Sequence, residues 1–462
     1  MGIGVSDWRL ARAVSARGHL GVVSGTCLDS LFVRRLQDGD PGGHLREAMA
    51  AFPIPRVAEA VESKWFLPGG RADDAPYGLL PLWKQHVSRS RLEISILAAF
   101  VEVQLARQGH DGPVGINLLT KLQLPTLSTL YGAMLAGVDY VLMGAGIPRE
   151  IPGVLDALAE HRLASMRFDV EGLPRGESET LSFDPGAHWE GMAPPPVARP
   201  AFLPIVASTS LARMMARKAN GSVEGFIIEG PTAGGHNAPP RGTLRTNVRD
   251  EPLYGERDEV DLDELLELGL PFWLAGGTGS PEALADARAR GAAGIQVGTL
   301  FAYADESGMA EPLKDRVLQG AARGDIDLHT DLRASPTGFP FKVVRIEGSA
   351  SEPEVYEARE RICDLGYLRT PYRRADGRIG YRCPAEPVDQ WEKKGGELQE
   401  TEGRRCLCNG LMADVGRAQM RANGPEPALV TSGDELLRSD SFLAAGARYS
   451  AAEVLDYLDP GG

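Results

Sequence analysis

Cysteine, basic charge and long apolar runs are all scarce in this chain, and each shortage excludes a class of protein. Five cysteines in 462 residues are too few, and odd in number, for the disulfide framework of a small secreted domain. The formal net charge of −14 argues against binding to a nucleic-acid backbone. No stretch of about eighteen apolar residues occurs, so we expect no transmembrane helix.

The first residues also lack the basic and apolar segments of a signal peptide, so we expect a cytoplasmic protein. Apolar content, in contrast, is ample. Hydrophobic residues make up 43% of the sequence, enough for one large core with an appended region.

Short apolar runs alternate with helical patterns, which is typical of βα units around a parallel sheet. Apolar residues recur at spacings of three and four in Pro125–Ala136, Ser208–Ala219 and Ser280–Arg290, which predicts helices there. We predict an α/β fold, a (β/α)8 TIM-type barrel whose first strand is missing at the N-terminus. The expected strands are Leu20–Ser24, Val114–Leu118, Tyr140–Met143, Leu203–Ala207, Gly225–Ile228, Phe272–Ala275 and Gly294–Val297.

The residues from Met1 to Ser6 have the character of a loop that follows a first strand. Ser6 is a candidate N-cap for a helix over Asp7–Ala16. Either the natural protein extends upstream of Met1 or the first strand has been trimmed away. An open sheet of seven strands is the alternative, and it would leave unpaired edges.

We divide the chain into a barrel over 1–334 and an irregular C-terminal extension over 335–462 that packs on it. Inserts interrupt the barrel at about 65–90, which is rich in Pro and Gly, and at 164–200. The second insert should contain a hairpin and then an extended, proline-rich connector. Further expected elements are a hairpin within Ala164–Phe183, a strand at Phe341–Ile346, a helix at Glu352–Cys363 and helical structure in Ser432–Tyr457.

The segment Glu229–His236, with the sequence EGPTAGGH, follows the expected strand Gly225–Ile228. Small residues there let a flat ring or a phosphate approach the main chain, and His236 would then face the mouth of the barrel. An imidazole titrates near neutrality, so His236 could act as base, acid or hydrogen-bond donor. We favour this catalytic role over a buried structural histidine.

Two later strand ends carry the same glycine chemistry. Gly276 and Gly277 lie in the turn before a helix that Ser280 should cap, and Gly298 and Thr299 follow the last expected strand. The last two βα loops of such barrels commonly bind a phosphate group. We therefore expect these loops to hold one phosphate from two sides.

Taken in order, these motifs resemble those of the nitronate monooxygenase family, relatives of the flavin-dependent enoyl reductases. The resemblance covers roughly residues 1–310 and implies a (β/α)8 barrel that binds FMN, with His236 over the reactive face of the flavin. The motifs that carry it are MGIGVS from Met1, GINL from Gly115, AGGH from Ala233, AGG from Ala275 and QVGT from Gln296. The cofactor-binding residues it implies are Met1, Gly2, Asn117, Gly234, Gly235, Gly276, Gly277, Gln296, Val297, Gly298 and Thr299.

The resemblance implies oxidative denitrification of an alkyl nitronate with O2, giving a carbonyl compound and a nitrogen oxide. The first alternative is an enoyl-thioester reductase that uses NAD(P)H, and the second is a flavin-binding scaffold without turnover. Arg241, Arg245 and Arg249 could attract an anionic small-molecule substrate, although a solvated basic loop is the interpretation we favour. We expect no nucleic-acid or membrane partner.

Four of the five cysteines, Cys363, Cys383, Cys406 and Cys408, lie in the C-terminal extension. Their spacing is loose, with one short pair and no Cys-x-x-Cys knuckle, so we expect reduced thiols rather than a metal site. Cys27 is expected to be a small buried apolar residue.

Overall fold

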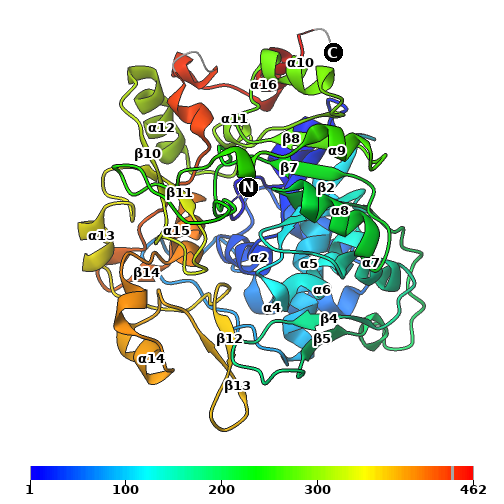
Figure 1. Cartoon of the computed structure of the whole chain (residues 1–462). Helices are drawn as coiled ribbons and strands as arrows, with labels where there is room; N and C mark the ends of the chain where they lie inside the picture. Colours follow the sequence, from blue (N-terminus) through cyan, green and yellow to red (C-terminus); the bar gives the residue numbers. More distant parts are fainter. Residues whose placement is uncertain (1, 439–441, 461–462) are drawn as a thin grey trace.

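The computed structural model describes residues 2–438 and 442–460, and its centre is a curled sheet of seven parallel strands (Figure 1). Neighbouring strands follow one another in the order β1-β2-β3-β6-β7-β8-β9, as βα units in a barrel do. The predicted α/β fold and all seven predicted strands are thereby confirmed. No pairing joins β1 to β9 in the described residues, so the curl is left open. The strands are β1 (Gly21–Ser24), β2 (Val114–Leu119), β3 (Tyr140–Gly144), β6 (Ala201–Val206), β7 (Phe226–Glu229), β8 (Phe272–Ala275) and β9 (Gly294–Gln296).

Helices connect successive strands, and two of them begin at the serines that the sequence indicates. Ser208 caps α8 by accepting from the Leu211 amide, and Ser280 caps α10 by accepting from the Ala283 amide. The helices up to residue 323 are α1 (Trp8–Ser15), α2 (Leu28–Gln37), α3 (His44–Ala50), α4 (Pro55–Trp65), α5 (Arg89–Ala106), α6 (Gln123–Leu135), α7 (Ile151–Ala159), α8 (Thr209–Lys218), α9 (Leu262–Leu266), α10 (Pro281–Ala289), α11 (Thr299–Ala302) and α12 (Glu311–Arg323).

The first helix corrects the expected cap. Asp7, rather than Ser6, is the N-cap of α1, and its carboxylate accepts from the amides of Arg9 and Leu10. Ser6 instead donates its hydroxyl to the carbonyl of Val22 in β1, at 2.6 Å. A carboxylate at this position also complements the helix dipole, which a serine hydroxyl does less well.

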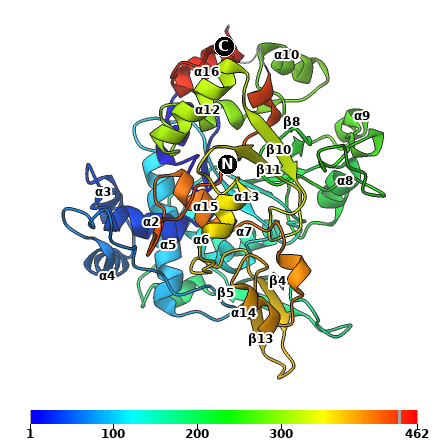
Figure 2. The same cartoon turned by 90° about the vertical axis from the view of Figure 1, so that its left-hand side faces the viewer.

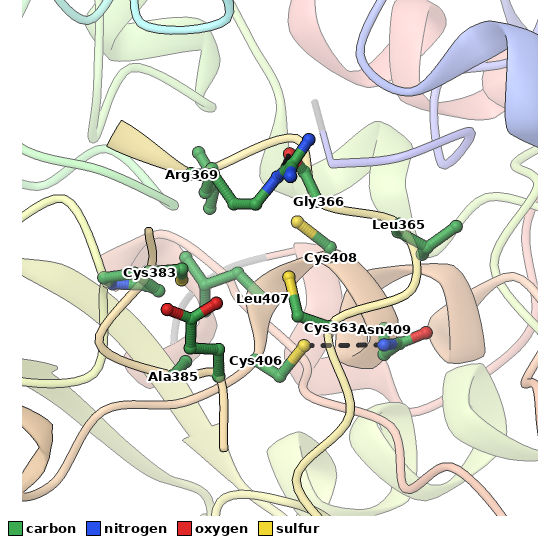
Figure 3. Close-up of a pocket in the computed structure, with 13 residues that line it drawn as sticks. Cys363, Leu365, Gly366, Arg369, Cys383, Ala385, Cys406, Leu407, Cys408 and Asn409 are labelled. Carbon is green, nitrogen blue, oxygen red and sulfur yellow. Dashed lines mark hydrogen bonds between the residues drawn. The ribbon is translucent and has the colours of Figure 1, made fainter. Parts of the chain in front are cut away.

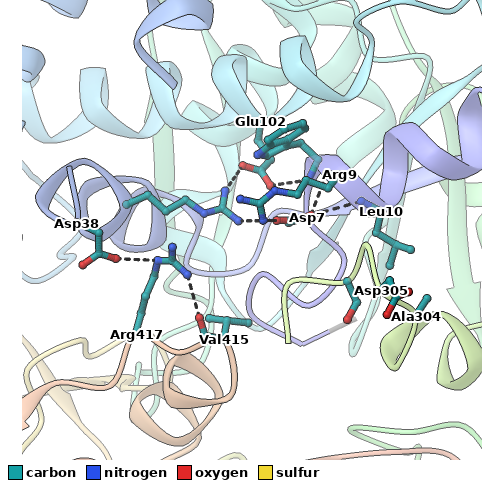
Figure 4. A network of polar contacts seen from close by, with 12 residues as sticks. Asp7, Arg9, Leu10, Asp38, Glu102, Ala304, Asp305, Val415 and Arg417 are labelled. Carbon is teal, nitrogen blue, oxygen red and sulfur yellow. Dashed lines mark hydrogen bonds and ion pairs between the residues drawn. The ribbon is translucent and has the colours of Figure 1, made fainter. Parts of the chain in front are cut away.

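Asp7 belongs to a buried ion network that joins α1, α2 and α5 (Figure 4). The Arg35 guanidinium lies 3.1 Å from Asp7 and 2.6 Å from Glu102, and Glu102 accepts from the amide of Trp8 at 2.9 Å. Burial disfavours the charge on Arg35, but the two carboxylates outweigh it and raise its pKa. The network fixes the N-terminal segment against the helical layer.

Both faces of the sheet are apolar, as expected for parallel strands covered by helices. Leu142, Leu203, Ile227 and Ala275 form one buried cluster on the concave face. The alternate residues of the strands, such as Val141 and Phe202, join the main core beneath the helices. No helix within residues 2–438 and 442–460 is long and apolar enough to cross a membrane.

The expected insert hairpin is present as β4 (Ala164–Phe168) paired with β5 (Glu179–Phe183). It contacts the C-terminal part of the chain through Glu171, whose amide donates to the Pro371 carbonyl at 2.9 Å. Arg382 adds an ion pair to Glu171 at 3.0 Å. The insert hairpin and the C-terminal part of the chain are therefore in direct contact below the sheet (Figure 1).

The C-terminal elements lie along one side of the molecule, and Figure 2 turns that side toward the viewer. The expected strand at Phe341–Ile346 is confirmed as β11, but the helix expected over Glu352–Cys363 ends at Ala358, where the backbone of Arg359 becomes extended. The domain boundary at 334/335 stays a prediction; it falls within the β10–β11 hairpin. These elements are β10 (Asp327–Asp331), β11 (Phe341–Arg345), α13 (Pro353–Ala358), β12 (Thr370–Arg373), β13 (Ile379–Arg382), α14 (Val388–Lys393), α15 (Leu407–Asp414), β14 (Met420–Arg421), β15 (Gly424–Pro425) and α16 (Ala451–Leu458).

Candidate functional site

The loops after β7, β8 and β9 meet at one edge of the sheet. Gly276 and Gly277 have φ angles of 90° and 68°, which favour glycine. A side chain at Gly276 would approach the Gly230 carbonyl to 3.0 Å, and one at Gly277 would approach the Thr232 hydroxyl to 3.0 Å. The structure thus brings together the glycine loops that the sequence singled out.

The third loop joins them through its main chain. The hydroxyl of Thr278 lies 3.3 Å from the carbonyl of Gln296, at the end of β9. Gly298 is the N-cap of α11 and Thr299 its first residue, and a Cβ at Gly298 would meet no atom within 4 Å. Val297 packs at the margin of the core. Open space beside Gly298 is compatible with a ligand close to this main chain.

Two further predicted residues, Asn117 and Gly2, lie on or beside the first two strands of the sheet, β2 and β1. Asn117 is buried inside β2, two positions before the strand ends at Leu119 rather than at its tip. Gly2 accepts through its carbonyl from the hydroxyl of Ser24, at 2.6 Å. This bond places the first loop at the carboxyl end of β1. Met1 lies outside the described residues.

His236 is held between the β7 loop and the C-terminal part of the chain. Its backbone forms a bridge with Phe341 in β11, and its ring meets the Phe341 ring edge-on at a centroid distance of 4.9 Å. Its Nε2 lies 2.6 Å from the hydroxyl oxygen of Ser335. Burial, together with the nearby charge of Lys121, lowers the pKa of His236 to about 3. The imidazole is therefore neutral at neutral pH and is a weak base.

Lys121 is a functional candidate that the sequence analysis missed. It follows β2, its ammonium lies over the ring of Phe339, and Nζ has no hydrogen-bond partner within the described part of the chain. Burial lowers the pKa of Lys121 to about 7. A buried amine without a partner, beside a buried imidazole, marks a site for a negatively charged or proton-accepting ligand. The signal in the sequence that could have identified Lys121 is its position shortly after the predicted strand Val114–Leu118.

A second unpredicted feature is the segment Thr431–Glu435, which lies directly on the glycine loops. The Gly235 amide donates to the Thr431 hydroxyl at 2.8 Å, and the Gly433 amide donates to the Thr299 hydroxyl at 3.0 Å. Any side chain at Gly234 would come within 2.7 Å of the Ser432 backbone. The segment is therefore a fourth wall of the site, although it lies about 130 residues after β9 in the sequence.

This segment also brings a carboxyl group to the glycine loops. Glu435 accepts a hydrogen bond from the Gly279 amide, just before the N-cap of α10. Burial raises the pKa of Glu435, while bonds from Gly279 and Thr299 act in the opposite direction. The Gly279 amide therefore already has a partner within the protein.

The arginines after His236 are largely engaged with the protein. The Arg241 guanidinium donates to the Ala207 carbonyl at 2.7 Å, and Arg249 pairs with Asp327 at 2.5 Å. These contacts agree with a structural surface loop, the interpretation that the sequence favoured.

Comparisons with known proteins point the same way as the motifs. Residues 197–336 match the family model of nitronate monooxygenase, which confirms the family resemblance over this segment. A curated relative from Mycobacterium tuberculosis, (3aS,4S,5R,7aS)-5-hydroxy-7a-methyl-1-oxo-octahydro-1H-indene-4-carboxyl-CoA dehydrogenase, is 28% identical over 143 residues. That match spans 31% of this chain and 36% of the relative.

Two solved structures are similar over nearly the whole chain. FabK from Thermotoga maritima has a TM-score of 0.46 at 16% identity, covering 98% of this chain and 88% of that one. Nitroalkane oxidase from Streptomyces ansochromogenes has a TM-score of 0.46 at 16% identity, covering 100% and 93%.

Proposed function

We propose that this chain, which carries the nitronate monooxygenase family match over residues 197–336, is a flavin-dependent oxidoreductase that oxidises alkyl nitronates with O2. The observation that carries the proposal is the half-buried pair of Lys121 and His236 beside three converging glycine loops. The pair suits a small anionic substrate, and the loops suit a phosphate-bearing cofactor.

FMN is the cofactor that the loops fit best. The Gly276 and Gly277 turn, the open main chain at Gly298 and the hydroxyl of Thr299 would hold its phosphate. Gly234, Gly235, Gln296 and Val297 would lie beside the same cofactor, and Gly2 and Asn117 would approach it from β1 and β2. When bound, the flavin supplies the redox chemistry, and the protein supplies orientation and charge.

His236 and Lys121 both contact the substrate in this proposal. Neutral His236 forms a hydrogen bond with the bound nitronate; its pKa of about 3 makes it too weak a base to remove a proton from the carbon next to a nitro group. Ser335 holds the ring through the contact at Nε2. The ammonium of Lys121, which has no other hydrogen-bond partner in the described chain, pairs with the nitronate oxygens.

A second function is favoured by one observation, the name of the curated relative, which is a dehydrogenase of a carboxyl-CoA thioester. In an enoyl-thioester reductase, NAD(P)H would be the reductant and a side chain would protonate the substrate. With a pKa of about 7, Lys121 is a better proton donor at neutral pH than His236, whose pKa is about 3. The residue that donates the proton would thus differ from the one the motifs indicate.

The test is anaerobic reduction of the purified, FMN-loaded protein, followed by the visible absorbance of the flavin. An alkyl nitronate and NADH or NADPH are mixed with it separately. Bleaching by the nitronate alone, with turnover once O2 is admitted, is the expected result. Bleaching only by NAD(P)H would replace the proposal with the thioester reductase. Binding of FMN without reduction by either would indicate a flavin-binding scaffold.

A further inference from the structure

Four cysteines that are scattered in the sequence line one buried cavity in the C-terminal part of the chain. They are Cys363, Cys383, Cys406 and Cys408, and each is a free thiol. In Figure 3 the sulfurs of Cys363, Cys406 and Cys408 point toward one another, with Cys383 on the other side. Sequence spacing alone did not reveal this arrangement, because 45 positions separate Cys363 from Cys408 by number.

Charges of both signs lie around the group. Arg369 and Glu386 line the cavity, and Arg359 pairs with Glu426 at 2.8 Å. Cys406 is the N-cap of the eight-residue helix α15 and Cys408 lies in its first turn, where backbone amides favour negative sulfur. The Asn409 amide also donates to the sulfur of Cys406, at 3.5 Å.

We propose that Cys363, Cys383, Cys406 and Cys408 bind one structural Zn²⁺ ion. Four S–H groups lose their protons to solvent as four Zn–S bonds form, and the site then carries two net negative charges. Arg369, which lines the cavity, offsets part of that charge. The cavity of about 10 Å³ accommodates a single ion but no iron–sulfur cluster.

Small side-chain adjustments complete the site. Among the described residues, no three Cys, His, Asp or Glu side chains already stand in metal-coordinating positions. Each cysteine sulfur can be redirected by rotation about a single χ1 bond. The backbone around the group is mostly irregular and linked by short strands and helices, a setting in which zinc commonly replaces a core.

The zinc site would also position the partner of His236. Directly before Cys406, the Arg405 amide donates to the Ala334 carbonyl at 2.8 Å, and Arg404 donates to the Ser335 carbonyl at 2.6 Å. Ser335 in turn contacts His236. The four cysteines therefore act as a structural anchor behind the candidate catalytic site, and their role does not depend on the substrate.

Elemental analysis of the purified full-length chain tests the proposal. We expect about one zinc per chain, released on titration of the thiols with a mercurial reagent. Co²⁺ exchanged into the wild-type protein should give the intense sulfur-to-cobalt absorption of four-thiolate coordination. These two measurements use the intact protein, so they remain informative even where a cysteine variant fails to fold.

Variants identify the ligands. Cys363→Ser, Cys383→Ser, Cys406→Ser and Cys408→Ser should each lose most of the zinc, whereas Cys27→Ser should retain it. Cys27 is the matched control because it is buried but does not line the cavity, although its pKa is affected by Cys408. Iron with visible charge-transfer colour would overturn the zinc assignment, as would full reactivity of all four thiols without any metal after zinc is supplied. Zinc that survives all four substitutions would also overturn it.

Discussion

At the scale of single residues, Lys121 stands out because its amine is buried without a hydrogen-bond partner in the described chain. Natural proteins rarely leave such a group unsatisfied unless a ligand completes it. The lowered pKa of about 7 means that the ammonium form predominates below neutrality and the neutral amine above it. The residue therefore links substrate affinity to pH.

For an anionic nitronate, kcat/KM of wild-type protein should fall as the pH rises through about 7, because Lys121 loses its charge there. Lys121→Met should raise KM by about tenfold to a hundredfold, the value of one charge-assisted hydrogen bond. It should also remove this limb of the pH profile. Steady-state kinetics measured from about pH 5.5 to about pH 9 would show both effects.

The control for that variant is Lys84→Met, which changes an exposed lysine in the insert loop. Its kinetics should match wild type throughout. A pH profile that keeps the same limb in Lys121→Met would show that another group carries the titration, and Glu229, whose pKa burial raises to about 7, is the next candidate.

At the scale of secondary structure, strands were predictable and their long-range partners were not. β8 occupies the predicted range Phe272–Ala275, because a short apolar run between glycine and proline turns leaves few alternatives. The N-cap of α1 was predicted at Ser6, one residue before its actual position at Asp7. The ion pair between Asp7 and Arg35 of α2 is a tertiary contact that the local sequence does not indicate. The glycine loops were predicted from local sequence, whereas Thr431–Glu435 and Lys121 join the site through tertiary contacts that no local pattern encodes.

The buried ion network offers a test of how strongly the helical layer depends on it. Arg35→Met leaves the carboxylates of Asp7 and Glu102 buried beside an apolar group, which should lower the free energy of unfolding by about 3–5 kcal/mol. Arg17→Met is the matched control, because Arg17 pairs with Asp456 on the exposed surface; its expected effect is below about 1 kcal/mol. Urea denaturation followed by circular dichroism compares the two, and equal midpoints would contradict the assigned difference.

At the scale of the whole molecule, the C-terminal part of the chain completes a site whose other walls come from the sheet. The Glu435 carboxylate lies at the same glycine loops where we propose that the FMN phosphate binds. Glu435→Gln keeps a hydrogen-bond acceptor for Gly279 but removes the negative charge. The affinity for FMN should therefore rise, by about tenfold, since one like-charge repulsion is relieved.

Titration of cofactor-free protein with FMN, followed by quenching of flavin fluorescence, measures that change. Glu402→Gln alters an exposed carboxylate elsewhere in the C-terminal part of the chain and should leave the affinity unchanged. Weaker FMN binding in Glu435→Gln, with Glu402→Gln unchanged, would mean that the carboxylate supports the cofactor rather than competes with it.

The contact between Thr431–Glu435 and the glycine loops has a consequence for biosynthesis. The loops after β7, β8 and β9 leave the ribosome well before residue 431 is translated, so they spend an interval without their fourth wall. The site we propose for FMN is therefore complete only after residue 435 has been translated and folded back. A chain that ends before residue 431 would still contain every strand of the sheet but would lack this wall of the site.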